Sequence, residues 1–377
     1  MAAITPFELK IPESELVALA DRLDHARWPE QEPVDDWSQG TKLAALKELV
    51  AYWRIEYDWR RCEARLNAIG QFTTEIDGLS IHFLHKRSSR PDAVPLIVTH
   101  GWPGSVVEFL GVIDELTEPS DPEAMAFHVV APSLPGYGFS GKPTGTGWGV
   151  ERIAKAWAVL MDRLGYEGWV AQGGDWGSAV TTAIGQLAPK GCKGIHLNMP
   201  IGRPGPDDMQ STDPKVLKAF QALGFYQEWD SGYSKEQSTR PQTIGYSLVD
   251  SPIGLAAWIL EKIYYWTDNG GSPWDALSMD QVLDDIMLYW LPATGASAAR
   301  LYWESFAKFG DGKVTIPSGA SAFPKEILPA PREWAERTLT NLVYWNDLDK
   351  GGHFAAWEQP ELFVAELRAC FAAILAQ

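Results

Sequence analysis

The chain has 377 residues, of which 45% are hydrophobic and 21% charged, and its formal net charge at pH 7 is −17. This length exceeds the commonest domain size and fits one large core with a smaller unit attached or inserted. The strong negative charge argues against nucleic acid and anionic membranes as partners, because both would be repelled at long range. Cys62, Cys192 and Cys370 have neither paired nor metal-type spacing, which favours a reducing compartment.

The first residues, MAAITPFELKIPESE, contain Pro and Glu where a signal peptide needs an uninterrupted apolar run. No segment of the sequence approaches the run of about 18 apolar residues that a membrane span requires. We therefore expect a cytoplasmic protein without a membrane anchor. Residues 1–70 give no convincing strand but have helical spacing at Glu13–Leu23 and Thr41–Glu56, which predicts an N-terminal helical arm.

From Phe72 onward, short β-rich runs alternate with helical stretches such as Val106–Glu115 and Ala154–Leu164. This alternation is expected of a mostly parallel sheet with crossover helices, and it predicts an α/β core over residues 71–200 and 311–377. The expected strands are Ile81–Leu84, Leu96–Thr99, Phe127–Ala131, Trp169–Ala171, Ile195–Asn198 and Asn341–Trp345.

Between these two parts of the core, over residues 201–310, the strand signals disappear. The segment begins with the loop-like Gly202–Pro206 and is rich in Trp, Tyr and helix formers. We expect it to be a helical lid inserted over the sheet. Its predicted helices are Val216–Leu223, Ile253–Ile263, Ser278–Tyr289 and Ala299–Phe309.

The sequence Gly173-Gly174-Asp175-Trp176-Gly177 follows a predicted strand and precedes the helical stretch Ser178–Leu187. A strand, a tight turn and a helix are the setting of a nucleophile elbow, in which small residues on both sides permit the strained turn. This setting predicts an α/β-hydrolase fold with Asp175 as the nucleophile. A Gly-rich turn in which Asp175 caps the helix is the plainer alternative.

An aspartate at the nucleophile position restricts the reaction. A carboxylate is ionised at neutral pH and attacks without the help of a base. Attack on an acyl carbon would give an anhydride, whereas displacement at a saturated carbon gives an alkyl ester that water can cleave at its carbonyl. The substrate should therefore carry its leaving group, an epoxide oxygen or a halide, on a saturated carbon.

The motif His100–Ser105, HGWPGS, directly follows the strand that ends at Thr99. In the hydrolase fold this loop supplies one backbone N–H of the oxyanion hole, and the residue after the nucleophile supplies the other. The two donors are predicted to be Trp102 and Trp176. A tight turn with a structural His100 is the alternative.

His353 lies in Gly351–Phe354, after the last predicted strand, where the order nucleophile, acid, histidine places the base. Apart from His100, the other histidines lie in or beside strands or in the arm and are interpreted as structural. The acid belongs on the loop after the penultimate strand. Val314–Phe323 is the candidate for that strand, and this selects Glu326 as the acid.

Other motifs carry weaker signals. Asp347 and Asp349 share the loop of His353 and are interpreted as solvated charges at its rim. Gly136–Gly141 matches G-x-G-x-x-G after a strand, but Pro143 interrupts the place where a helix would have to open, which argues against a dinucleotide site. The sequence has no P-loop, HExxH or clustered Cys/His set. We expect no cofactor and no metal.

These residues resemble those of the microsomal-type epoxide hydrolases, the family of the xenobiotic and juvenile-hormone enzymes. The resemblance runs nearly end to end and implies a role in detoxification, although the N-terminal membrane anchor of the animal enzymes has no counterpart. It is carried by Ala26–Pro29, Tyr57–Arg60, His100–Ser105, Gly173–Gly177, Ser251–Ala257 and Gly351–Pro360.

The resemblance implies a lid with two tyrosines whose hydroxyls bind and protonate the epoxide oxygen. Tyr302 matches one of them, and Tyr233 matches the other more loosely. It also implies Asp175 as nucleophile, His353 as base and Glu326 as the acid that orients the base. The lid tyrosines that stay open as alternatives to Tyr233 are Tyr226, Tyr246, Tyr264, Tyr265 and Tyr289.

The expected reaction is the hydrolysis of a small apolar epoxide by water to a vicinal diol, through an alkyl-aspartate ester; whether the chain forms a homo-oligomer stays open. A haloalkane dehalogenase is the alternative enzyme, because it shares the elbow Asp and uses an indole N–H such as that of Trp176. A halide leaves without a proton, however, and has no need of the lid tyrosines. A catalytically silent binding protein on this fold would not need nucleophile, base and acid in this order.

Overall fold

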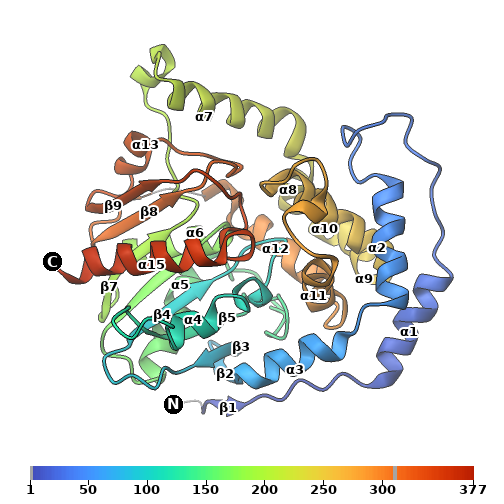
Figure 1. The fold of residues 1–377 in the computed structure, drawn as a ribbon, viewed down its shortest axis with the longest axis horizontal. Coiled ribbons are helices and arrows are strands. Elements are labelled where there is room, and N and C mark those ends of the chain that lie inside the picture. The colour runs from blue at the N-terminus through green and yellow to red at the C-terminus, as the bar shows by residue number, and fades with distance from the viewer. Residues whose placement is uncertain (1–2, 309–311) are drawn as a thin grey trace.

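One sheet of nine strands lies at the centre of the computed structural model, which describes residues 3–308 and 312–377 (Figure 1). The strand order is β1-β2-β3-β5-β4-β6-β7-β8-β9. Pairing is parallel from β5 through β4 to β9, and β1, β2 and β3 pair antiparallel, so the mostly parallel sheet is confirmed. The strands are Thr5–Pro6 (β1), Gln71–Ile76 (β2), Leu79–Lys86 (β3), Val94–Thr99 (β4), Phe127–Pro132 (β5), Trp169–Gly173 (β6), Cys192–Leu197 (β7), Ser318–Ala322 (β8) and Leu342–Asp347 (β9).

The first edge of the sheet differs from the sequence prediction. β1 lies in the arm, where no strand is expected, because two residues that include Pro6 show no strand period; proline is tolerated at a sheet edge. β2 and β3 form a hairpin across Asp77 and Gly78, whose φ angles of 52° and 77° suit a tight two-residue turn. β2 is not among the expected strands, although Asp77-Gly78 is a local sequence signal from which this hairpin could have been predicted.

Helices cover both faces of the sheet, so the central strands are mostly apolar and buried, and Leu96 and Ile97 of β4 are fully buried. α6 packs against β4, β6 and β7, and α15 packs against β7, β8 and β9, in front of the sheet in Figure 1. The predicted helix Val106–Glu115 is divided into a 3-10 turn and a short helix. The core helices are η1 (Val106–Phe109), α4 (Ile113–Thr117), α5 (Val150–Arg163), α6 (Trp176–Leu187), α13 (Arg332–Glu336), α14 (Ala355–Glu358) and α15 (Pro360–Leu375).

Between β7 and β8 the described chain forms a helical lid, with α7 projecting from the rest (Figure 1). α8 and α9 are not predicted from the sequence, because polar residues and glycines dilute the apolar period there. Phe309 and the predicted boundary between residues 310 and 311 lie outside the described residues. The helices are α7 (Pro214–Phe225), α8 (Gly232–Thr239), α9 (Pro241–Asp250), α10 (Pro252–Trp266), α11 (Met279–Trp290) and α12 (Gly295–Ser305); the short turns are η2 (Pro206–Gln210), η3 (Tyr226–Asp230), η4 (Pro273–Asp275) and η5 (Phe306–Lys308).

No single helix in the described part of the chain is long and apolar enough to cross a membrane. α9 and α10 meet the criterion only together, and a bend of 115° separates them.

The N-terminal arm runs along the edge of the sheet and then beside the lid (Figure 1). Its helices are α1 (Glu13–Asp24), α2 (Leu43–Ile55) and α3 (Trp59–Ile69). Tyr57 and Arg61 both donate to the buried carboxylate of Asp284 in α11, at 2.8 and 2.9 Å. Trp37 stacks on Tyr264 of α10 with ring centroids 4.0 Å apart. The arm therefore fixes α10 and α11 in place.

Candidate active site

The turn between β6 and α6 holds Asp175 in a conformation that side chains rarely adopt, with φ 51° and ψ −126°. Two residues before and two residues after Asp175, the chain needs glycine. A Cβ at Gly173 would lie 2.0 Å from the carbonyl oxygen of Gly177, and a Cβ at Gly177 would lie 1.8 Å from the carbonyl oxygen of Thr99. The Asp175 carboxylate makes no capping hydrogen bond to α6. The helix-cap alternative is therefore wrong, and the carboxylate is free to face the lid.

One oxygen of Asp175 is held by the loop that follows β4. The backbone N–H of Trp102 donates to Asp175 Oδ1 at 2.7 Å. His100 braces this loop: its Nδ1 donates to the carbonyl of Gly101 at 2.9 Å, and its Nε2 accepts from the N–H of Leu134 at 3.2 Å. Trp176 begins α6, and its backbone N–H as the second oxyanion donor stays a prediction.

The structure places His353 between two carboxylates. Its Nδ1 lies 2.7 Å from Glu326 Oε1, and its Nε2 lies 3.4 Å from Asp175 Oδ2. His353 and Glu326 each have 2% of the side chain exposed, against 14% for Asp175. Burial by itself lowers the pKa of His353, but the Glu326 and Asp175 carboxylates outweigh it, and the pKa stands well above its ordinary value. In the free enzyme the two carboxylates thus favour the protonated form of His353.

Sequence reasoning missed the residue that holds the His353 loop. Glu358, at the end of α14, accepts the backbone N–H groups of Gly352, Phe354 and Asp268 at 3.0, 2.9 and 2.7 Å. Burial raises the pKa of Glu358 to about 7 despite these bonds. Asp268 follows α10, so Glu358 ties the loop to the lid. A glutamate five residues after the histidine gives no distinctive sequence signal.

The predicted lid tyrosines both face the nucleophile loop. Tyr233 stacks on Trp102, with ring centroids 4.9 Å apart and planes at 8°. Tyr302 meets the edges of Trp102 and Trp176 at 5.8 and 4.7 Å, and it lies 5.7 Å from Tyr233. Burial raises the pKa of both hydroxyls well above 10, so both remain protonated.

The remaining lid tyrosines have other surroundings. The hydroxyl of Tyr226 lies 3.3 Å from that of Tyr233 and donates to Ser234 Oγ. Tyr289 donates to the carbonyl of Gly104 at 2.8 Å, a structural bond. Tyr246 is exposed, whereas Tyr264 and Tyr265 pack against Trp37 of the arm.

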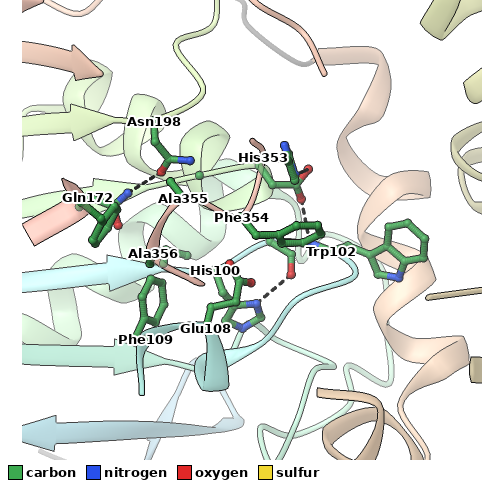
Figure 2. Close-up of a pocket in the computed structure, with 15 residues that line it drawn as sticks. His100, Trp102, Glu108, Phe109, Gln172, Asn198, His353, Phe354, Ala355 and Ala356 are labelled. Carbon is green, nitrogen blue, oxygen red and sulfur yellow. Dashed lines mark hydrogen bonds and ion pairs between the residues drawn. The ribbon is translucent and has the colours of Figure 1, made fainter. Parts of the chain in front are cut away.

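A cavity of about 20 Å³ lies beside the nucleophile and is lined by Asp175, His353, Glu108 and Gln172 among others (Figure 2). Among the described residues, no group of three or more His, Cys, Asp or Glu side chains could hold a metal ion. Asp347 is exposed and pairs with Lys215 Nζ at 2.8 Å. Gly136–Gly141 lies in the loop between β5 and α5, where no helix opens in the described chain.

Comparison with known proteins agrees with this geometry. Residues 4–109 match the family model described as epoxide hydrolase N terminus, and residues 94–239 match that of the alpha/beta hydrolase fold. A protein of Stigmatella aurantiaca, provisionally named an epoxide hydrolase, is 55% identical over 98% of this chain and 84% of its own length. Epoxide hydrolase 1 of Sus scrofa is 36% identical, over 97% of this chain and 88% of its own. The crystal structure of juvenile hormone epoxide hydrolase from Bombyx mori superimposes with a TM-score of 0.92 at 31% identity, covering 100% of this chain and 96% of that one.

Proposed function

Because the chain belongs to the microsomal-type epoxide hydrolase family and has the α/β-hydrolase fold, we propose that it hydrolyses an apolar epoxide to a vicinal diol through an alkyl ester on Asp175. One observation carries this proposal. Asp175 Oδ1 accepts the N–H of Trp102, while Oδ2 lies 3.4 Å from His353 Nε2. Oδ1 is therefore held by a backbone donor while Oδ2 is left to attack, and His353 lies where it can activate water against the resulting ester.

In the first step Asp175 Oδ2 attacks a ring carbon and the carbon–oxygen bond of the epoxide breaks. The leaving alkoxide is strongly basic, so it needs a proton donor. The hydroxyls of Tyr233 and Tyr302 are the proposed donors, because both are neutral and buried above the nucleophile loop. A halide would need neither hydroxyl, which argues against the dehalogenase alternative.

In the second step the charge on His353 changes. Once Asp175 is an ester it no longer bears a negative charge, so one of the two carboxylates that raise the pKa of His353 is lost. The imidazolium then gives up its proton more readily, and this proton restores the tyrosine hydroxyl that was ionised in the first step. The neutral ring, oriented by Glu326, can now deprotonate water. The ester carbonyl at Oδ1 develops its negative charge against the N–H of Trp102.

The side chains that surround the reacting oxygens suggest the substrate class. Trp102, Trp176, Tyr233 and Tyr302 are aromatic and buried. Such walls favour an apolar substituent on the epoxide, and water is the only other reactant needed. We therefore propose a neutral, apolar epoxide as substrate.

The experiment that tests this function separates the two steps. His353→Ala should still be alkylated but should not hydrolyse its ester, so intact-protein mass spectrometry after mixing with styrene oxide or a terpene epoxide should find an adduct heavier by one substrate mass. Asp175→Ala should form no adduct, and peptide mapping should place the label on Asp175. If neither variant formed an adduct with an epoxide that the wild type converts, water would attack the epoxide directly and the proposed ester would be wrong.

A further inference from the structure

The hydrolysis step needs a water molecule held in line with Cγ of Asp175. One hydrogen bond to His353 fixes neither the position of that water nor its lone pair, and a misplacement of about 1 Å can cost on the order of 100-fold in rate. The cavity beside Asp175 has a volume of about 20 Å³. One water molecule needs at least about 10–15 Å³ on this measure. The cavity therefore has the size of a single water site.

In the part of the chain that the structure describes, five polar side chains besides Asp175 and His353 line this cavity. His100 bonds to its own loop and Thr99 accepts from the indole of Trp157. We name the other three the water chamber: Glu108, Gln172 and Asn198 (Figure 2). Gln172 comes from β6 and Asn198 directly follows β7, so rigid strands position both. The Nε2 of Gln172 donates to Asn198 Oδ1 at 2.7 Å, which orients the amide. Its Oε1 is buried and has no hydrogen-bond partner among the described residues. A buried acceptor of this kind is ordinarily satisfied by an ordered water.

Glu108 brings a carboxyl group to the same cavity from η1. The carboxyl lies against the backbone of Gly104, where a Cβ would fall 1.7 Å from Glu108 Oε1. Burial, followed by the nearby Asp285 carboxylate, raises the pKa of Glu108 well above its ordinary value, although His353 lowers it. A neutral carboxyl offers one donor and one acceptor. It can hold a water without placing a second negative charge beside the ester oxyanion.

We propose that the water chamber holds and orients the hydrolytic water, with Glu108 and Gln172 as positioning residues; this rests on the ester mechanism proposed above. The water oxygen bonds to Cγ of Asp175, its proton passes to His353 Nε2, and the carbonyl electrons move to Oδ1. When the intermediate collapses, the bond from Cγ to the diol oxygen breaks. The diol oxygen takes the proton from His353, and the neutral ring then takes the proton that remains on the new carboxyl group. Asp175 thus regains its carboxylate with one oxygen from water, and His353 ends as an imidazolium.

The two half-reactions distinguish this role from a structural one. Glu108→Met keeps the length of the side chain but removes its hydrogen bonds, so hydrolysis of the ester should slow by about 10- to 100-fold while the alkylation rate constant changes little. Quenched-flow mixing with a converted epoxide, followed by intact-protein mass spectrometry, measures both constants and the fraction of enzyme held as ester. That fraction should rise in Glu108→Met. Glu108→Gln keeps a donor and an acceptor and should restore most of the hydrolysis rate.

Gln172→Leu provides a second, independent variant and should also slow hydrolysis of the ester without slowing alkylation. If Glu108→Met fails to fold, Gln172→Leu alone tests whether the water chamber positions the water. Phe109→Leu is the matched control, because Phe109 lines the same cavity but offers no hydrogen bond. Equal slowing of both steps, or no slowing of either, would overturn the water chamber. Failure of the ester mechanism is separate, since His353→Ala would then form no adduct either.

Discussion

At the scale of single residues, Tyr233 and Tyr302 combine two properties that a proton donor needs in an apolar pocket. Burial raises the pKa of both hydroxyls well above 10, so neither is lost as a donor near neutral pH. Both rings are also fixed, since Trp102 stacks on one and meets the other edge-on. Resemblance to the family suggests Tyr302 well and Tyr233 more loosely, and the contacts of Tyr233 with Trp102 and Tyr302 in the fold favour it over the other lid tyrosines.

Tyr302→Phe should slow alkylation, because the developing alkoxide loses one of its two donors, by roughly 100-fold. Adding Tyr233→Phe should nearly abolish alkylation. The quenching of tryptophan fluorescence on rapid mixing with an epoxide measures this step, since Trp102 and Trp176 adjoin the reacting atoms. Tyr289→Phe is the control and should retain most of the activity, because its hydroxyl bonds to the backbone of Gly104. A double variant that was alkylated at the wild-type rate would refute the assignment of both donors.

At the scale of elements, backbone hydrogen bonds fix the position of the loop between β9 and α14 that carries His353. Glu358 accepts hydrogen bonds from three backbone N–H groups, two in the loop itself and one at Asp268 beside the lid. The backbone N–H of His353 also donates to the carbonyl of Trp266 at 2.9 Å. The base is thus located relative to the lid as well as to the sheet.

Glu358→Gln should lower both stability and the rate of ester hydrolysis. One oxygen of Glu358 accepts from Phe354 and the other from Gly352 and Asp268. The NH2 group of glutamine would replace one of these oxygens and would face at least one backbone N–H from which it cannot accept a hydrogen bond. A buried donor left without a partner costs about 1–3 kcal/mol. Thermal unfolding measures the loss. The exposed Glu123→Gln is the control and should stay within about 0.5 kcal/mol of the wild type; equal stability of the two variants would argue against the proposed role of Glu358.

The elements predicted from the sequence are those whose signals are local. The apolar runs of β4 to β7 and the glycines around Asp175 follow from short stretches of chain, and so does the placement of His353 after the last strand. β1, α8 and α9 were missed because their residues are ordered by contacts with distant segments. Glu108 and Glu358 were missed for the same reason: Glu358 lies within the family-like segment Gly351–Pro360, but the role of each glutamate depends on the neighbours that the fold brings to it.

At the scale of the whole molecule, the sheet buries histidines that cannot easily take up a proton. Burial lowers the pKa of His82 and His196 to about 3 and that of His85 and His100 to about 4. In the unfolded chain each would titrate near 6.5. The unfolded state therefore binds more protons below about pH 6.5, and stability is lost as the pH falls from there toward 3 to 4.

His196 offers the clearest test of this acid sensitivity, because it is fully buried and its Nδ1 has no partner among the described residues. His196→Phe should flatten the loss of unfolding free energy between pH 6.5 and 5 by up to about 1.4 kcal/mol per pH unit. Urea unfolding at several pH values measures this slope. The backbone hydrogen bond to Asp21 raises the pKa of the exposed His25, so His25→Asn should not flatten the slope; a slope unaltered in His196→Phe would show that other groups govern acid unfolding.

The contacts between the arm and the lid have a consequence for handedness. The arm holds Asp284 of α11 and Tyr264 of α10 through Tyr57, Arg61 and Trp37. α10 in turn packs against the walls of the pocket, because its Trp266 meets the rings of Trp102 and Tyr233. Mirror-image epoxides differ only in where a substituent meets those walls, and about 1.4 kcal/mol between their barriers gives a tenfold preference. Residues of the arm, remote from the ring that opens, are therefore expected to influence which enantiomer is consumed first.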